Sequence, residues 1–425
     1  MSVVAFLNAT GSLLVSGAAM SKSVLLVGGG LLQVAQVRAA KELGLRTVVT
    51  DRNPDCVCAS LADEFHQVDI YDVRRHVALA KEIPDLKGVF AAALDTECTV
   101  SAAANAIGLP GISYEAALNC KSKTRMRQRF DEAGFSWNPH WAEVFTWDLN
   151  WALAIANEIG FPLICKNTDN SASRGTSIVR SEQELPEAVE RASRASWTMS
   201  ALLEELWEGP EQSVEIMFLK DEVVHLNVVD RLFLEKDKYL VEEGHVSPSK
   251  LSDAEKLELY QLAEDAARAV GVDWSVFKID TIWTKDGPRI LECTARLSGG
   301  FDSTHSQYLA TGRDFVRAAL RLAIGEDVKS DDEDLRHKFH KFSAARAILT
   351  QPGCIRTLSG LEEARAVPGM KEVIMRFGVG DVVPALEDCG ARVGFVITQA
   401  ETYDGAWDIA GEALCKVQIE VGERC

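Results

Sequence analysis

Residues 277–296, FKIDTIWTKDGPRILECTAR, decide the fold of this chain. Two runs rich in β-branched and aromatic residues flank a short KDG turn, which predicts an antiparallel strand pair. Antiparallel pairing would bring Asp280 and Glu292 to the same side of the sheet. Two buried carboxylates repel each other unless a cation compensates, and a hard divalent ion such as Mg²⁺ or Mn²⁺ would supply that charge. Arg296 follows on the same face and suits a phosphate or a carboxylate. An ordinary Glu–Arg surface pair is the simpler alternative.

The composition is that of an ordinary globular protein. The chain has 425 residues, of which 47% are hydrophobic and 25% charged, enough for about two to four domains. The formal net charge of -18 would repel phosphate backbones and anionic lipids, so we expect no nucleic acid and no membrane partner. No run of 18 apolar residues is present, which argues against a transmembrane helix. Ten cysteines without CxxC spacing are expected to be reduced thiols, which favours a cytoplasmic protein.

The sequence pattern divides the chain into four segments. Residues 1–21 are mildly apolar but lack a basic region, so we expect an N-terminal extension. Over 22–115, β-rich runs such as SVLLVGGG and RTVVTD alternate with amphipathic stretches, which predicts a parallel α/β domain. A second domain is expected over 116–328, with a hairpin near 165–205 whose polar tip NSASRG is mobile. The charge run SDDED predicts a linker, and 329–425 would form the C-terminal domain.

Glycine-rich and basic segments give no decisive phosphate site. Residues 28–30, all glycine, follow a strand and Asp51 ends the next one, as in dinucleotide-binding proteins. Position 33 is Gln where a third motif glycine is expected, so a tight turn without a cofactor is favoured. No GxxxxGK[ST] loop exists. Lys166 ends an apolar strand and either reaches solvent or meets a ligand phosphate. Most of the alternating basic run 121–129 is expected to be solvated, because alternate positions do not share one helix face.

Taken in their order along the chain, five features resemble the ATP-grasp superfamily. They are Lys123 eleven residues before the helix-ending Gly134, then FPLICKNTDNSASRG, LLEELWEGPEQSVE, FKID and LECTAR. The resemblance extends from residue 22 through the C-terminal segment, which is similar to the terminal domain of L-amino acid ligases and their biotin carboxylase-like relatives. It implies an α/β protein with an ATP-grasp fold, a preceding Rossmann-like domain and an α+β C-terminal domain.

The resemblance also implies roles for individual residues, with ATP and Mg²⁺ (or Mn²⁺) as cofactors. The two implied catalytic residues are Arg296, which would steady the transferred phosphate, and Lys166. The implied ATP-binding residues are Lys123, Lys166, Glu204, Glu205, Leu206, Glu211, Ser173, Arg174 and Gly175. In this set the lysines would contact phosphates, residues 204–206 would read the adenine edge, Glu211 would hold the ribose, and residues 171–175 would form a lid. The implied metal ligands are Asp280, Glu292 and Thr294, the last at a position that is usually Asn in the family.

The activity implied by the resemblance is ATP-dependent ligation. A small-molecule carboxylate would be activated as an acyl phosphate and joined to an amine, with release of ADP and phosphate. The bicarbonate-using pattern has Glu four residues after the arginine, where this chain has Gly300, so a dipeptide-type ligase is favoured. Candidate substrate residues are Arg231, Ser298, Gly299, Gly300 and His305, the last four in a loop, RLSGGFDSTHS, that we expect to be flexible. A carboxylase-type enzyme and a non-catalytic nucleotide-binding protein stay open as alternatives, and the resemblance implies a homodimer.

Overall fold

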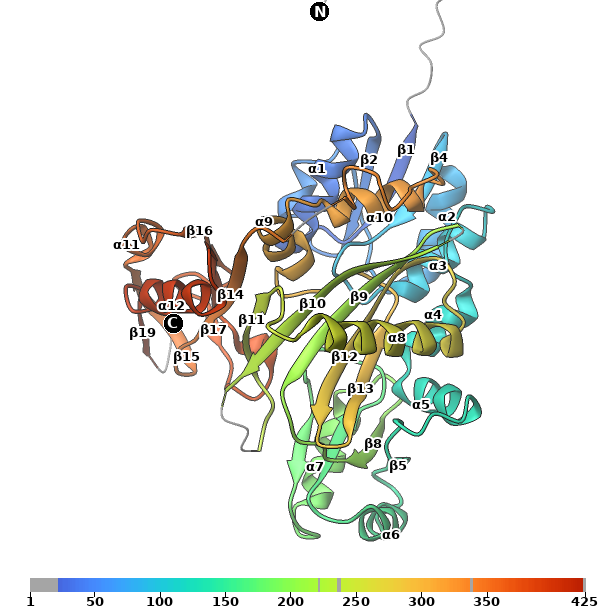
Figure 1. The fold of residues 1–425 in the computed structure, drawn as a ribbon, viewed down its shortest axis with the longest axis vertical. Helices are drawn as coiled ribbons and strands as arrows, with labels where there is room; N and C mark the ends of the chain where they lie inside the picture. The colour runs from blue at the N-terminus through green and yellow to red at the C-terminus, as the bar shows by residue number, and fades with distance from the viewer. Residues whose placement is uncertain (1–21, 221, 235–237, 337–338, 423–425) are drawn as a thin grey trace, which may run out of the picture.

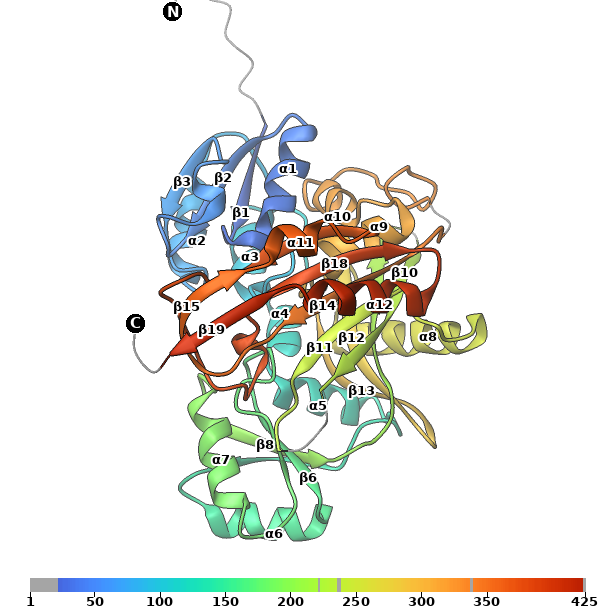
Figure 2. The same ribbon diagram turned by 90° about the vertical axis from the view of Figure 1, so that its left-hand side faces the viewer.

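The computed structural model of the protein describes residues 22–220, 222–234, 238–336 and 339–422. The extension expected at 1–21 lies outside the described residues. Figures 1 and 2 show an N-terminal α/β unit at one end of the molecule, a small antiparallel unit at the other, and a long sheet between them. Part of the C-terminal segment extends that long sheet, and its remaining strands and helices lie beside it.

The N-terminal unit is built around a parallel sheet with strand order β3-β2-β1-β4. All five residues of β1 are buried, as expected for a parallel strand covered on both faces. The Asp51 carboxylate accepts a hydrogen bond from the backbone N–H of Gly29 at 2.8 Å, so this acid closes the glycine turn internally. The elements are β1 (Ser23–Val27), η1 (Leu31–Gln33), α1 (Val34–Glu42), β2 (Arg46–Asp51), η2 (Val57–Ala59), β3 (Glu64–Gln67), α2 (Val73–Glu82), β4 (Leu86–Phe90) and α3 (Glu97–Asn105).

The small antiparallel unit has strand order β5-β8-β6-β7 and packs α6 and α7 against an aliphatic core. The predicted hairpin is confirmed, because β6 and β7 pair antiparallel with Leu163 opposite Val179. Its connection, residues 168–176, is referred to below as the lid loop. The elements from the N-terminal unit onward are α4 (Tyr114–Lys121), α5 (Lys123–Glu132), β5 (Trp141–Phe145), α6 (Leu149–Ile159), β6 (Leu163–Asn167), β7 (Ser177–Val179), α7 (Leu185–Arg194) and β8 (Ser200–Glu205).

The long sheet has eight strands in the order β13-β12-β9-β10-β11-β14-β18-β16. The antiparallel pair predicted from the KDG turn is confirmed, with Asp280 directly opposite Glu292. Helix α8 covers one face of β9, β10 and β12 and leaves the other face to the cavity described below. The elements are β9 (Glu211–Phe218), β10 (Val223–Phe233), β11 (Glu242–Ser247), α8 (Asp253–Val270), β12 (Ser275–Thr284), β13 (Gly287–Thr294), the π-helical turn η3 (Asp302–Ser306), α9 (Gln307–Thr311) and α10 (Phe315–Ala323).

The C-terminal segment extends the long sheet, because β11 pairs with β14. The run SDDED is predicted to be a linker, but its last residue does not fit that prediction. Asp334 is buried and accepts hydrogen bonds from the guanidinium of Arg317. A separate three-stranded sheet has the order β17-β15-β19. The elements are β14 (Phe342–Ile348), β15 (Gly353–Ser359), α11 (Leu361–Arg365), β16 (Met370–Met375), β17 (Val382–Val383), η4 (Cys389–Ala391), β18 (Gly394–Ala400), α12 (Tyr403–Leu414) and β19 (Gln418–Gly422).

Two expectations drawn from composition concern the state of the cysteines and membrane-spanning helices. Free thiols are present at Cys56, Cys58, Cys98, Cys120, Cys165, Cys293, Cys389 and Cys415. Cys354, by contrast, is disulfide-bonded, so the expectation of reduced cysteines is wrong for that residue. None of the helices in the described part of the chain combines the length and apolar character needed to span a bilayer.

Candidate active site

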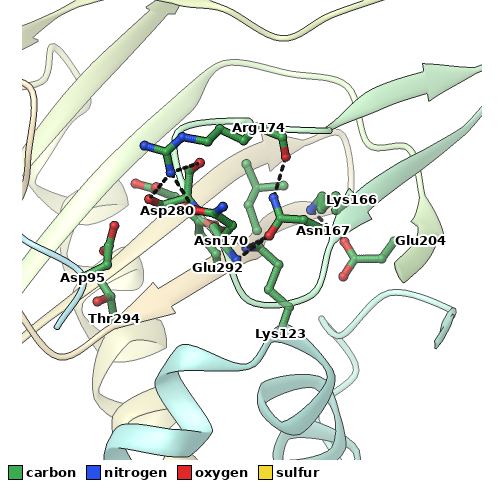
Figure 3. A network of polar contacts seen from close by, with 12 residues as sticks. Asp95, Lys123, Lys166, Asn167, Asn170, Arg174, Glu204, Asp280, Glu292 and Thr294 are labelled. Carbon is green, nitrogen blue, oxygen red and sulfur yellow. Dashed lines mark hydrogen bonds and ion pairs between the residues drawn. The ribbon is translucent and has the colours of Figure 1, made fainter. Parts of the chain in front are cut away.

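A cavity of about 640 Å³ lies between the open face of the long sheet and the small antiparallel unit. Strands β6 and β8 and the lid loop line one side, and strands β9 to β13 line the other. Asp95 from the N-terminal unit and Arg392 from the C-terminal segment also line it. Side chains of both charges therefore converge from four parts of the chain, and Figure 3 shows their central group.

Asp280 and Glu292 form a pair of carboxylates at the centre of this group (Figure 3). Burial opposes ionisation of Asp280, but Arg231 and Lys278 outweigh it and hold its pKa well below the usual range. Glu292 is less enclosed, with 38% of its side chain exposed, and lies 3.5 Å from Lys123 Nζ. Two carboxylates on adjacent strands offer the hard oxygen ligands that Mg²⁺ and Mn²⁺ prefer, so the donor set fits a divalent cation.

Thr294 does not join this pair. Its hydroxyl donates to the Glu97 carboxylate in α3, and it is absent from the cavity wall. Burial, and next the charge of Asp95, raise the pKa of Glu97, which favours its neutral acid form. Within the described residues no group of three or more Asp, Glu, His or Cys side chains is arranged to hold a metal. Of the three predicted metal ligands, the structure therefore brings Asp280 and Glu292 together and leaves Thr294 apart from them.

Arg296 does line the cavity, and Asp95 of the N-terminal unit holds its guanidinium in place. Its Nε and Nη2 atoms donate to Asp95 Oδ1 at 2.7 and 2.5 Å. Burial opposes ionisation of Asp95, but Arg296 outweighs it and holds the pKa of this carboxyl well below its usual range. The arginine is thus fixed in one orientation beside the carboxylate pair, and its Nη1 atom donates to the carbonyl of Leu297.

Glu204 lies at the opposite end of the cavity, at the end of β8, and is 2% exposed. Lys166 Nζ donates to its Oε2 at 2.7 Å, and Arg127 Nε donates to its Oε1 at 2.7 Å. Burial opposes ionisation, but Arg127 and Lys166 lower the pKa of Glu204 to about 2. Glu205, Leu206 and Glu211 continue the cavity wall from there.

Lys123 joins the base of the lid loop to the carboxylate pair (Figure 3). Its Nζ donates to the carbonyl of Asn170 at 2.6 Å and lies within ion-pair distance of Glu292. Ser173 and Arg174 line the cavity as predicted. Gly175 does not line it. Its backbone, with φ +69°, packs so closely on α7 that a Cβ would come within 2.7 Å of the Ala195 Cβ.

The predicted substrate residues separate into two groups. Arg231, Ser298, Gly299 and Gly300 line the cavity. His305 does not: its ring lies 3.5 Å from the Glu372 carboxylate in β16 and packs edge-on against Phe301. The expectation of a flexible loop over 297–306 is wrong, because most of this segment is buried. Its backbone at Ser298 and its hydroxyl at Ser303 both donate to the buried Glu215, which pins the segment to β9.

Five residues that the sequence interpretation did not assign complete the site: Asp95, Arg127, Asn167, His245 and Lys278. Arg127 lies one helical turn after Lys123 on the same face of α5, which was a usable signal in the basic run. Lys278 lies two residues before Asp280 on the same face of β12, a second usable signal. Burial lowers the pKa of His245 to about 4, so its imidazole is neutral near pH 7. No local pattern marked Asp95, Asn167 or His245.

The comparisons with known proteins agree with this architecture. Residues 122–331 match the family model for the carbamoyl-phosphate synthase L chain ATP binding domain, and residues 346–422 match L-amino acid ligase C-terminal domain 2. The two sheets and the cavity between them define an ATP-grasp fold. Within that fold the chain resembles the L-amino acid ligases and their biotin carboxylase-like relatives.

Three similar proteins show the extent of the match. The L-amino acid ligase from Bacillus licheniformis superposes with TM-score 0.81 at 19% identity, over 95% of this chain and 99% of that one. The biotin carboxylase domain dimer of 2-oxoglutarate carboxylase from Hydrogenobacter thermophilus, solved with MgADP, ADP and bicarbonate, gives TM-score 0.72 at 22% identity, over 94% and 91%. The uncharacterized protein y4rH of Sinorhizobium fredii is 26% identical over 390 residues, covering 89% of this chain and 78% of that protein.

Proposed function

We propose that the chain is an ATP-dependent carboxylate–amine ligase that forms an amide bond and releases ADP and phosphate. The observation that carries the proposal is the convergence of charges in one cavity. The Asp280–Glu292 pair suits a divalent cation, and Lys123, Lys166 and Arg296 reach the same space from three different elements. Phosphoryl transfer to a carboxylate needs charge neutralisation and alignment more than it needs a protein nucleophile.

Within this proposal the two ends of the cavity bind different partners. ATP lies along β8, with its base beside residues 204–206 and its phosphates beside Lys123, Lys166 and the lid loop. The organic acid lies toward Arg296 and Arg231, where an acyl phosphate oxygen finds a fixed guanidinium. A divalent cation held by Asp280 and Glu292 would neutralise phosphate charge. The lid loop, which contacts the C-terminal segment through the Cys389 N–H and the Ala172 carbonyl at 3.1 Å, would exclude water from the intermediate.

An amino acid is favoured over bicarbonate as the acid. The position four residues after Arg296 is Gly300, which lines the cavity without an acidic side chain. The bicarbonate-using pattern that the family resemblance implies has Glu at this position. The match of residues 346–422 to an L-amino acid ligase domain supports the same choice. The proposal includes a cytoplasmic setting and a homodimer, the latter by analogy with the biotin carboxylase domain dimer.

The test is ADP and phosphate release by the full chain with Mg²⁺ and ATP across amino acids, alone and in pairs, with bicarbonate as a separate condition. Release that requires a particular pair, with a condensed product of the matching mass, is the expected result. Turnover with bicarbonate alone would assign the carboxylase-type activity instead. ATP binding without turnover in any condition would favour the non-catalytic alternative. Glu292→Gln serves as the inactive control.

A further inference from the structure

Lys278 and Arg231 hold the Asp280 carboxylate before any ligand arrives. Lys278 Nζ donates to Asp280 Oδ2 at 2.6 Å, and Arg231 Nη1 lies 3.4 Å from the same oxygen. The other oxygen, Oδ1, accepts from the Ser213 hydroxyl at 2.5 Å. A divalent cation that approached Oδ2 would therefore meet two positive charges. Asp280 must loosen its contact with at least one of them before it serves as a metal ligand.

Arg231 and Lys278 differ in the counter-charges that remain beside them when the Asp280 carboxylate turns away. Arg231 also pairs with Glu211 at 3.3 Å and with Glu242 at 3.1 Å, so its charge stays compensated. Lys278 is 8% exposed, and within the described residues Asp280 is the carboxylate with which it forms an ion pair. An ammonium left buried without a counter-charge is unfavourable. Lys278 consequently needs a second anion whenever Asp280 faces a metal.

That anion must enter from the cavity, because Lys278 lines it. Its neighbour across β9 is Glu215, whose carboxylate is already engaged by Ser298 and Ser303. On the β13 side the neighbour is Thr294, whose hydroxyl donates to Glu97. The two groups that face Lys278 across the sheet are thus engaged elsewhere. Asp302 is another acid near Lys278 in the cavity wall, but burial and then the charge of Glu215 raise its pKa, which favours its neutral form and makes it a poor counter-charge. The open direction from Lys278 is therefore toward the cavity.

We propose that Lys278 binds the carboxylate of the organic acid and that Asp280 holds the place of this carboxylate until a divalent cation draws Asp280 away. This inference rests on the proposed ligase function and adds a binding residue and an order of events to it. The two binding steps support each other: metal binding frees Lys278 for the acid, and the acid removes the charge that competes for Asp280. Acid and metal should therefore bind with positive cooperativity.

The first arm of the test measures metal binding without turnover. Mn²⁺ is titrated into the full chain with a non-hydrolysable ATP analogue, and free Mn²⁺ is followed by its paramagnetic signal. Lys278→Met removes the competing charge and should bind Mn²⁺ at least about fivefold more tightly than wild type. Lys285→Met, in the exposed turn of the same hairpin, should bind it like wild type. Equal or weaker Mn²⁺ binding by Lys278→Met would overturn the placeholder role.

The second arm measures the acid. With the amino acid selected by the pairwise screen, Lys278→Met should raise the KM for the acid about tenfold or more and change the KM for ATP less than about twofold. Lys278→Arg should restore most of the acid affinity. An unchanged KM for the acid would refute the carboxylate-binding role. Lys278→Gln replaces Lys278→Met if the latter does not fold. If the wild-type chain released no ADP in response to any acid, the ligase function itself would be refuted. The Mn²⁺ arm does not depend on that outcome.

Discussion

Glu204 and Glu292 line the same cavity and are held in opposite ways. Glu204 is enclosed, and both of its oxygens accept hydrogen bonds from cationic side chains at 2.7 Å. Glu292 is 38% exposed, and among the described residues its ion pair is the one at 3.5 Å with Lys123. A carboxylate whose oxygens are already paired with protein cations has little capacity to bind a ligand. A carboxylate that faces the cavity with a single distant partner keeps that capacity. We therefore assign Glu204 mainly to structure and Glu292 mainly to ligand binding.

Arg127→Met should have the largest effect and would act on the Glu204 side. Arg127 is fully buried and also donates to the carbonyls of Ile290 and Leu291, so its removal leaves the buried Glu204 with Lys166 as its cationic partner and takes the guanidinium donors from the two carbonyls. We expect a loss of about 3–5 kcal/mol in the free energy of unfolding by urea. Arg129→Met, on the exposed face of the same helix, should change it by about 0.5 kcal/mol or less. Equal stability of the two variants would contradict the structural role of Glu204.

The pH dependence of stability tests the same cluster. The pKa of Glu204 falls from near 4.5 to about 2 in the folded chain. A depressed carboxyl pKa gives stability that is fully present above pH 4.5 and is lost as the pH falls through 2, here about 3 kcal/mol. Unfolding measured by urea between pH 6 and 3 should show wild type losing more stability than Glu204→Gln. If wild type and Glu204→Gln lost the same stability as the pH fell, Glu204 would not be the source of the loss of stability in acid.

Glu292→Gln tests the ligand-binding side. The amide keeps the shape and removes the charge, so turnover should fall at least about a hundredfold while stability changes by about 1 kcal/mol or less. ADP release at rising Mg²⁺ together with urea unfolding checks both parts. Asp286→Asn, in the exposed turn of the hairpin, is the matched control and should retain activity. Near-normal turnover in Glu292→Gln would remove this residue from the metal site.

Thr294→Val should have the smallest effect on activity. The Thr294 hydroxyl donates to Glu97 and does not line the cavity, so its loss should change turnover by about threefold or less. The dependence of ADP release on Mg²⁺ should be unchanged. A loss above about tenfold that high Mg²⁺ restores would return Thr294 to the metal shell, as the family resemblance implied.

The parts of the site that sequence predicts are those fixed by local geometry. The short KDG turn sets the register of β12 and β13 as far as Thr281 opposite Ile290, so the strand pair followed from spacing. A register shift between Asp280 and Thr281 then places Asp280 opposite Glu292, and the spacing did not reveal that shift. Contacts between units carry no such local signal. Arg296 pairs with Asp95 and Thr294 with Glu97 across separations of 201 and 197 residues, which depend on how the N-terminal unit packs. Similarly, burial of 298–306 depends on Glu215 in a distant strand, and no hydropathy pattern in RLSGGFDSTHS revealed it.

Transfer of oxygen from the acid to phosphate tests the central claim most directly. The acid selected by the screen is labelled with ¹⁸O in its carboxylate and incubated with the full chain, Mg²⁺, ATP and the amine. An acyl phosphate route carries one labelled oxygen into inorganic phosphate for each amide formed, and that is the result we predict. Unlabelled phosphate accompanying amide formation would contradict activation of the acid by phosphoryl transfer in this cavity.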